Sequence, residues 1–435
     1  MKLFTHLRPY QNPSIFTLIH RSMTTSKRVR DRSKNKRIQN LEIATEKWKI
    51  FSKIHLLLET LTSEPEHVAP ITTLDRLRRQ INLPRPHKLS DFLRKSPKLF
   101  ELCRDRKGTT WVGLTQMGED LLEEEERLIG ENEDKAAEYV TRFLMMAVEN
   151  RVRVDKIAHF RRDLGLPTDF RERWVNKYPE LFRVVRSDDD DGLECLELVE
   201  WRKEWAVTEL EKKVAATGGG DGGGNGRPGM LSLAFPLKYP PNYKKLFRYG
   251  GKIAHFQKRE YLSPYGDARG LMAGSLEFDK RAVAIMHELL SFTLEKRLVT
   301  DHLTHFRQEF VMPQKLMRLL LKHFGIFYVS ERGRRYHVFL TEAYDGLELV
   351  DKSPLVLWRE KVQSLIGYRG KKKKIETFDE LSDLEVKDLL DVDSDDESSS
   401  EELDESQNIV DELGSDDEEM DLAELDDEYN ECGTA

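Results

Sequence analysis

The chain has 435 residues, of which 39% are hydrophobic and 34% charged, and this length allows two or three packed units with a sizeable core. No stretch approaches the ~18–20 consecutive apolar residues that a membrane span needs, so we expect no span. The three cysteines, Cys103, Cys195 and Cys432, are far apart, which argues against a disulfide scaffold and a CxxC zinc site.

Charge is distributed very unevenly along the chain. Residues 375–435 contain 27 acidic residues and one basic residue, Lys387, whereas the preceding 374 residues carry a net charge of +18. The whole chain has a net charge of −8. The part before the acidic tail is therefore basic, and the tail alone makes the chain acidic.

The N-terminal segment, residues 1–30, has the composition of an organelle transit peptide. It contains no acidic residue, six Lys or Arg, and seven Ser or Thr between short apolar groups. We favour the mitochondrion over the chloroplast because the arginines begin early and the apolar groups are bulky. The alternative interpretation is a basic arm that binds RNA or directs the chain to the nucleus.

Three copies of one sequence pattern follow. Residues 149–161 align with residues 295–307 at an offset of 146, and Pro167 aligns with Pro313 at the same offset. A further copy lies 83 residues upstream of the 149–161 copy and aligns Pro84 with Pro167. The three units occupy about 41–130, 134–213 and 279–366.

Each copy has the same expected elements. Apolar residues at helical spacing predict a helix over 43–61, 136–148 and 282–294. A short helix then ends at the proline, with Asp155 and Asp301 as its expected N-caps, and a second helix follows. Paired apolar runs predict a hairpin in each copy. This order resembles a winged helix, and the predicted fold is mainly α with short β-hairpins (α+β).

A Gly-rich segment, residues 214–229, follows the second copy. Its composition is typical of a flexible linker and predicts a domain boundary there. We therefore expect repeats one and two over 41–213, and an insert with repeat three over 230–370.

The insert, residues 230–270, is rich in basic and aromatic residues, with eight Lys or Arg against two acids. Cations neutralise phosphates and aromatic rings stack on bases, so this composition suits single-stranded nucleic acid. Alternatively, the rings pack on neighbouring units. The candidate RNA-binding residues are Tyr243, Lys244, Lys245, Arg248, Tyr249, Lys252, Lys258, Arg259, Tyr261 and Tyr265, and Arg332, Arg334 and Arg335 in the third hairpin.

The acidic tail, residues 375–435, contains long like-charge blocks that resist compaction, and we expect it to be disordered. A functional interpretation is a polyanion mimic that shields the basic surface or binds a basic partner. The alternative is a tail that only keeps the chain solvated.

Several motifs appear together in the order typical of one family. They are Arg28–Asp31, Phe92–Phe100, Tyr261–Ala268, Glu277–Leu290 and Phe324–Ser330. With these motifs the chain resembles the plant organelle RNA recognition (PORR) domain family of What's This Factor-like organelle splicing factors, over roughly 28–366. The resemblance implies nuclear-encoded, organelle-targeted RNA-binding proteins that assist group II intron splicing. It supplies no residue-level RNA contacts.

No catalytic arrangement of residues and no metal-ligand spacing is present in the sequence, so we expect no enzyme, no cofactor and no metal. His159 and His305 occupy equivalent repeat positions, which favours a shared structural role. The leading hypothesis is a protein that binds group II intron RNA, with other splicing factors as further partners. The alternatives are a winged-helix DNA-binding or chromatin factor with an acidic tail, and a scaffold whose repeats bind proteins.

Overall fold

A computed structural model describes residues 36–81, 83, 87–186, 193–216, 233–241, 243, 247–330 and 335–367. The predictions on residues 1–30, on the acidic tail and on most of the Gly-rich linker lie outside these residues. The helices and strands below belong to one compact unit, which includes the described residues between Gln39 and Lys238 and those from Phe247 to Gly367. No helix in the described ranges is long and apolar enough to cross a bilayer.

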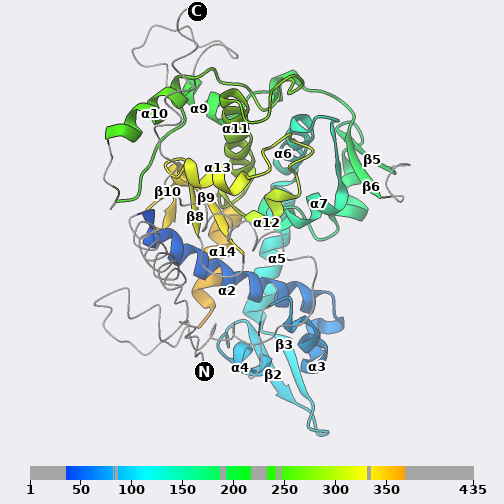
Figure 1. Cartoon of the computed structure of the whole chain (residues 1–435). Coiled ribbons are helices and arrows are strands. Elements are labelled where there is room, and N and C mark those ends of the chain that lie inside the picture. Colours follow the sequence, from blue (N-terminus) through cyan, green and yellow to red (C-terminus); the bar gives the residue numbers. More distant parts are fainter. Residues whose placement is uncertain are drawn as a thin grey trace, which may run out of the picture. The chain divides into compact units, whose positions relative to one another are not determined.

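The main elements repeat three times along the chain (Figure 1). Repeat one contains α2 (Gln39–Thr62), β1 (Val68–Pro70), α3 (Ile71–Leu74), α4 (Leu89–Arg94), β2 (Phe100–Arg104) and β3 (Thr110–Leu114). Repeat two contains α6 (Glu133–Met146), β4 (Arg151–Arg153), α7 (Val154–His159), α8 (Arg161–Leu164), η3 (Phe170–Trp174), η4 (Val175–Lys177), β5 (Phe182–Arg186) and β6 (Glu194–Leu198). Repeat three contains α11 (Leu276–Phe292), β7 (Arg297–Val299), α12 (Thr300–Thr304), α13 (Leu316–Lys322), β8 (Phe327–Ser330) and β9 (His337–Leu340).

Other elements connect or follow the repeats. They are α5 (Gln116–Glu131), α9 (Glu209–Ala216), α10 (Phe247–Lys258), β10 (Tyr344–Asp345), β11 (Glu348–Leu349) and α14 (Pro354–Leu365), with short 3-10 turns at Pro65–His67, Asp75–Arg78, Lys203–Trp205 and Thr341–Ala343. Helix α9 includes residues 214–216, the first residues of the predicted linker.

The predicted α+β class is confirmed, and the three hairpins form as expected. Each repeat has one antiparallel sheet in the same order: β1-β3-β2, β4-β6-β5 and β7-β9-β8. The first strand of each sheet was not predicted. These strands are only three residues long, which is too short for a visible alternation of apolar and polar residues.

The same unusual backbone conformation recurs at equivalent positions of the repeats. His67, Asn150 and Lys296, which are related by the offsets of 83 and 146, all have positive φ angles, of 54°, 54° and 48°. Gly165 and Val311, also 146 residues apart, share a positive φ as well. Non-glycine residues rarely adopt this conformation, so its recurrence indicates one shared backbone design.

The expected N-caps are wrong. Helix α7 begins at Val154 with Arg153 in the cap position, and α12 begins at Thr300 with Val299 in the cap position, both without a side-chain cap bond. The cap residue is in each case the last residue of the preceding strand, because the strand runs directly into the helix. Asp155 instead lies in the first turn, where its charge suits the helix dipole, 2.5 Å from Arg171.

Repeats two and three pack with equivalent residues facing each other. Val148 N–H donates to the carbonyl of Glu309 at 2.9 Å, and the residues at an offset of 146, Leu294 and Asp163, form the matching bond at 2.8 Å. The rings of Phe160 and Phe306 lie 4.8 Å apart. Such reciprocal contacts are typical of a two-fold axis, so these two repeats form a pseudo-symmetric pair.

The equivalent histidines lie in the same pseudo-symmetric contact. The rings of His159 and His305 stack with centroids 6.1 Å apart and an angle of 17° between their planes. This geometry agrees with the shared structural role expected from their repeat positions.

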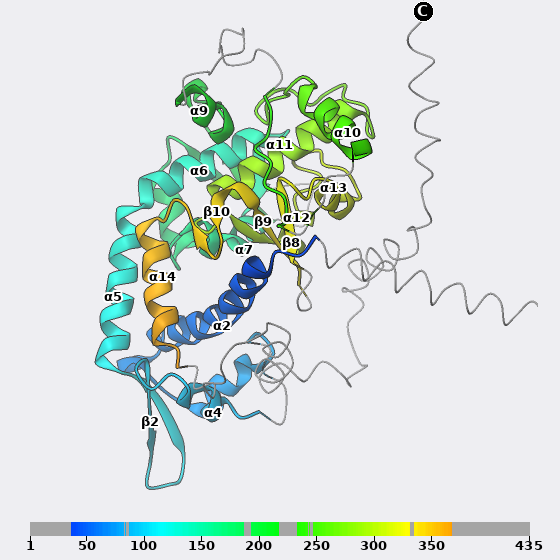
Figure 2. The same ribbon diagram turned by 90° about the vertical axis from the view of Figure 1, so that its left-hand side faces the viewer.

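Repeat one is joined to repeat three through helix α2, which covers the outer face of the third sheet. The hydroxyls of Tyr328 and Ser330 both donate to the buried carboxylate of Glu42. Trp48 lies edge-on to His337, with ring centroids 4.9 Å apart, and under the guanidinium of Arg297. Helix α14 packs against both α2 and α5 (Figure 2).

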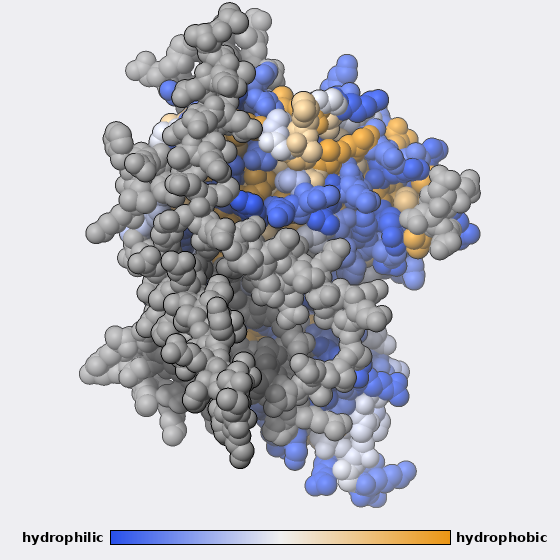
Figure 3. All heavy atoms as spheres, viewed as in Figure 1, coloured by the Kyte–Doolittle hydropathy of each residue, from blue (hydrophilic) through white to orange (hydrophobic). Residues whose placement is uncertain are grey.

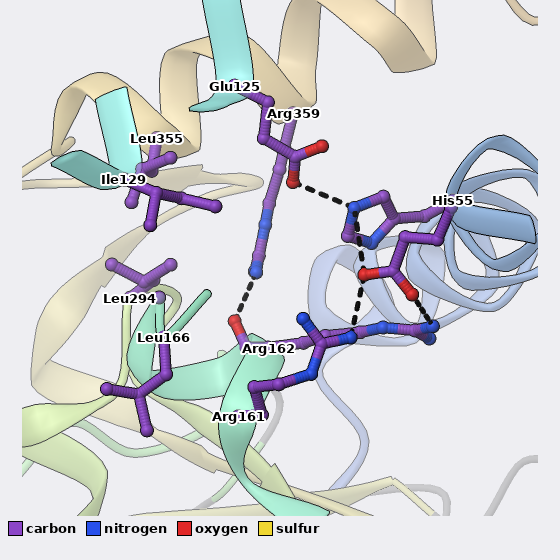
Figure 4. A pocket seen from close by; sticks show the side chains of 11 residues that line it. His55, Glu125, Ile129, Arg161, Arg162, Leu166, Leu294, Leu355 and Arg359 are labelled. Carbon is purple, nitrogen blue, oxygen red and sulfur yellow. Dashed lines mark hydrogen bonds and ion pairs between the residues drawn. The ribbon is translucent and has the colours of Figure 1, made fainter. Parts of the chain in front are cut away.

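A small polar junction joins α2 of repeat one and the connecting helix α5 to α8 of repeat two and to α14 (Figure 4). The carboxylate of Glu59 accepts hydrogen bonds from Arg161, at 2.7 Å, and from Arg162. His55 lies 2.8 Å from Glu125. Arg359 of α14 donates to the backbone carbonyl of Arg162.

Candidate nucleic-acid interface

The insert is anchored on repeat three. Phe256 of α10 is buried, and its ring centroid lies 4.2 Å from that of His323. The side-chain amide of Gln257 bonds both backbone groups of Phe235, at 2.7 and 3.1 Å. Lys280 of α11 donates to the carbonyls of Gln257, at 2.8 Å, and Arg259, near the end of α10. Burial lowers the pKa of Lys280 to about 8.

A buried polar network holds the second part of the insert. The hydroxyl of Tyr265 donates to Glu288 at 2.7 Å and accepts from Arg142 at 3.0 Å. Arg142 also bonds Glu288 directly at 2.5 Å, and both side chains are fully buried. Arg142 and Glu288 lie 146 residues apart, so this ion pair too joins equivalent positions of repeats two and three.

Two of the candidate tyrosines therefore have structural partners. The ring of Tyr265 is 8% exposed, so stacking on a base would require this packing to open. Tyr261 is half-buried and donates to Thr208 at 3.0 Å. Burial raises the pKa of both phenols, which keeps them protonated as donors. Tyr243 is half-buried and stacks on Tyr239, with ring centroids 5.5 Å apart.

The candidate cations are spread over different environments. Lys252 and Lys258 are exposed on α10, and Arg259 is half-buried with Glu277 3.2 Å away. Arg335 is exposed just before β9. The remaining candidates lie outside the described residues or have side chains that do, and their RNA contacts stay predictions: Lys244, Lys245, Arg248, Tyr249, Arg332 and Arg334.

From Lys280 onward, the charged residues of the motif on α11 are buried. Arg281 donates to the carbonyl of Phe310 at 2.9 Å, and His287 lies 3.2 Å from Glu342. Lys280 and Glu288 make the contacts described above. Every residue of α11 from Lys280 to Phe292 is buried, so these charges position neighbouring elements and do not face solvent. No cluster of three potential metal ligands occurs within the described residues.

Repeat one contains a basic surface that the sequence interpretation missed. The segment from Lys88 to Lys107, which runs from α4 into the β2–β3 hairpin, contains seven basic and three acidic residues. All seven cations are exposed, and Trp111 on β3 is 36% exposed. The space-filling view shows hydrophilic and near-neutral residues at the hairpin (Figure 3). The local density of cations could have revealed this surface.

The corresponding segment of repeat two, residues 171–190, contains five basic and five acidic residues, and most of its cations have acidic partners. On the β5–β6 hairpin, Arg183 lies 2.9 Å from Glu197 and Arg186 lies 3.8 Å from Glu194. Lys177 is 2.8 Å from Glu133. The positive charge of this hairpin is therefore largely balanced across its own strands.

Comparison with known proteins gives a consistent result. The family model described as "Plant organelle RNA recognition domain" matches residues 36–371. A rice protein named "Protein WHAT'S THIS FACTOR 1 homolog, chloroplastic" is 38% identical over 72% of this chain and 62% of its own length. The chain thus spans less than two thirds of that relative. No solved structure shows a significant match.

Two relatives from Arabidopsis thaliana differ in their names and coverage. "Protein ROOT PRIMORDIUM DEFECTIVE 1" is 30% identical over 86% of this chain and 92% of its own length. "Protein WHAT'S THIS FACTOR 9, mitochondrial" is 25% identical over 71% of this chain and 78% of its own length.

Proposed function

The chain belongs to the plant organelle RNA recognition family, and from this premise we propose that the protein binds organelle RNA and assists the splicing of group II introns. The observation that carries the proposal is the family match over residues 36–371, which spans all three repeats. The exposed cations between Lys88 and Lys107 supply a surface suited to phosphates. The protein needs no catalytic group of its own, because the intron RNA supplies the chemistry.

Each repeat is best interpreted as a winged helix. The order helix, strand, helix, helix, strand, strand recurs, and the sheet order places the third strand between the first and second. Repetition of such a small module favours an extended binding surface over an enclosed catalytic pocket. A protein that binds the native intron fold more tightly than misfolded forms shifts the RNA toward the native fold by that difference in affinity.

Sequencing organelle transcripts from a loss-of-function line tests the splicing role. We expect specific group II introns to be retained, while transcripts without introns keep their normal abundance. Normal splicing of every organelle intron in that line would overturn the proposal for splicing.

The winged-helix order itself favours a second candidate, a DNA-binding factor, because winged helices commonly bind duplex DNA. The two candidates are separated by measuring the affinity of the full chain for RNA and for duplex DNA of the same sequence and length, at the same salt concentration. We expect tighter binding to RNA. Tighter binding to the DNA duplex would favour the second candidate.

The proposed compartment is an organelle, and the mitochondrion is our specific choice from residues 1–30. The names of the similar proteins include both chloroplastic and mitochondrial members. A fusion of residues 1–50 to a fluorescent protein tests the choice. We expect mitochondrial fluorescence; plastid fluorescence would change the compartment, and a cytosolic or nuclear signal would contradict organelle import by this segment.

A further inference from the structure

We propose that one surface of repeat one holds single-stranded RNA, with phosphates on Lys95, Lys98, Arg106 and Lys107 and an unpaired base stacked on Trp111. These five residues are called the repeat-one surface below. This assignment rests on the proposed RNA binding and specifies the place and the form of the RNA.

The strand register puts Trp111 on the outer face of the first sheet. It pairs with Cys103 of β2 and with Pro70 of β1. Its neighbour Val112 points to the opposite face and is fully buried. Successive side chains of a strand point to opposite faces of the sheet. Because Val112 is buried in the core, the indole ring of Trp111 lies on the solvent-facing side.

The tip of the hairpin has a defined conformation that presents two of the cations. Gly108 has a φ of 84°, and its N–H donates to the carbonyl of Asp105 at 2.9 Å. Arg104 donates from Nε to the carbonyl of Gly108 at 3.2 Å. Arg106 and Lys107 lie within this closed loop and are exposed. The hairpin projects away from the helices in both views (Figures 1 and 2).

The four cations of the repeat-one surface are available to a ligand. Within the described ranges, none of them forms an ion pair, and all four are exposed. Two of the three acids in the basic segment of repeat one are already engaged: Asp91 lies 3.3 Å from Arg94, and the carboxylate of Asp105 accepts the backbone N–H of Arg106 at 2.6 Å. The third, Glu101, is exposed on the same face of the sheet as the indole ring, and the seven cations and three acids of the segment leave a net charge of +4. The surface therefore carries excess positive charge beside an exposed ring.

The three repeats differ at the position of Trp111. Its equivalents, identified by their pairing with the first strand of each sheet, are Cys195 and His337. His337 is 2% exposed and lies beneath Trp48 of α2. Cys195 is half-buried and offers no ring. Among the three sheets, that of repeat one alone has an exposed aromatic ring at this position.

This chemistry favours a single strand over a duplex. A base can stack on an indole ring only when its face is free, and base pairing and stacking hide those faces in a duplex. Lys98 lies at the base of the hairpin, and Arg106 and Lys107 lie at its tip. Trp111 lies between them along the strands, so these cations can contact the phosphates that flank the stacked base.

The test measures binding of the full chain to a short single-stranded RNA of mixed sequence at several salt concentrations. Trp111→Leu should weaken binding by roughly 5- to 150-fold, with little change in the salt slope, because stacking releases no counterions. Trp111→Phe should keep part of the affinity. Changing all four cations to Gln should reduce the magnitude of the log–log salt slope by roughly 2 if about three of them contact phosphate.

A matched control changes four exposed cations of repeat two, Arg173, Lys177, Arg183 and Arg186, to Gln. It removes the same charge, but three of these cations already have acidic partners, so it should leave the salt slope close to that of the wild type. Equal losses in both four-Gln variants would indicate a bulk charge effect and overturn the site. Thermal melting of each variant separates loss of folding from loss of binding, and quenching of tryptophan fluorescence by RNA should decrease in Trp111→Phe.

The possible results distinguish failure of the repeat-one surface as the binding site from failure of the proposed RNA-binding function. A wild-type chain that binds no RNA, single-stranded or duplex, would contradict the proposed function. A wild-type chain that binds RNA, with unchanged affinity in the repeat-one variants, would overturn only the site. A further variant changes four lysines of the insert to Gln: Lys244, Lys245, Lys252 and Lys258. If this variant loses RNA binding while the repeat-one variants keep it, the RNA-binding site lies in the insert. Tighter binding to duplex RNA than to the single strand would also overturn the assignment.

Discussion

At the scale of single residues, buried charged side chains hold repeats two and three and the insert together. Arg142 and Glu288 pair with each other in the interior, and the insert hydroxyl of Tyr265 joins them. A charge removed from water is tolerated only when partners satisfy it. The network therefore ties repeat two, the insert and repeat three together, and a substitution in it should act on folding first.

Arg142→Met should destabilise the protein by about 3–5 kcal/mol, because it leaves the buried carboxylate of Glu288 without its partner. The free energy of unfolding in denaturant measures this. The double variant Arg142→Met, Glu288→Met should be more stable than the single variant, since it removes both charges. The exposed pair of Arg127 and Glu131 provides the control, where Arg127→Met should change stability by about 0–1 kcal/mol. A similar small change for Arg142→Met would contradict the structural role.

Glu59 should make stability depend on acid pH. Burial works to raise its pKa, but the positive charges of His55, Arg162 and Arg161 outweigh this and lower the pKa to about 2. The pKa is depressed in the folded state, so its stabilisation is fully present above the ordinary value of 4.5 and is lost as pH falls toward about 2. The stabilisation is on the order of 3 kcal/mol.

The measurement is unfolding free energy against pH for the wild type and for Glu59→Gln. The variant should be less stable at neutral pH and should show a flatter dependence between pH 4.5 and about 2. Glu131→Gln, on the exposed pair, serves as the control with an unchanged profile. Parallel profiles for the wild type and Glu59→Gln would count against the assigned charge interactions.

At the scale of elements, helix α5 shows how packing can outweigh the helix propensity of a residue. Its two glycines have the same low intrinsic helix propensity, but they lie in different surroundings. A Cβ on Gly118 would lie 2.7 Å from the carbonyl oxygen of Leu99, whereas a Cβ on Gly130 would meet nothing within 4 Å. The first glycine is required by a close approach of backbone, and the second is not.

Gly130→Ala should stabilise the protein by about 0.5–1 kcal/mol, because alanine loses less conformational freedom in a helix. Gly118→Ala should destabilise it, since the backbone around Leu99 must move. Thermal melting of the two variants gives a direct comparison within one helix. Equal shifts in the same direction would contradict the role of the close approach at Gly118.

The secondary-structure elements also differ in how well the sequence predicts them. The first helix of each repeat and the hairpins carry clear periodicity, and the sequence predicts them within about six residues of their observed bounds, whereas α5, α10 and α14 were not predicted. The strand Val68–Pro70 was missed because three residues carry no alternation. Asp155 was misplaced as a cap because the strand before α7 was missed, so the start of the helix was placed incorrectly.

At the scale of the whole molecule, the acidic tail should compete with RNA. Residues 375–435 carry a net charge of −26, and the preceding part of the chain is basic. Deleting them should raise RNA affinity at low salt, with a smaller gain at high salt because ions screen the attraction. The midpoint of thermal unfolding should stay the same. Binding curves for the full and truncated chains at two salt concentrations measure the effect, and equal affinity at low salt would exclude shielding.

The repeat, the α+β class and the family can be recognised from the sequence alone, because they depend on local periodicity and on short motifs of consecutive residues. The exposure of each aromatic residue depends on the packing of the whole chain. Tyr265 lies in a region rich in cations and aromatics, yet a buried ion pair from two distant helices holds its hydroxyl. Trp111 and His337 occupy equivalent positions, but helix α2 covers only the second of them. Burial depends on what the rest of the chain places above a residue, and that long-range packing leaves no pattern in the local sequence.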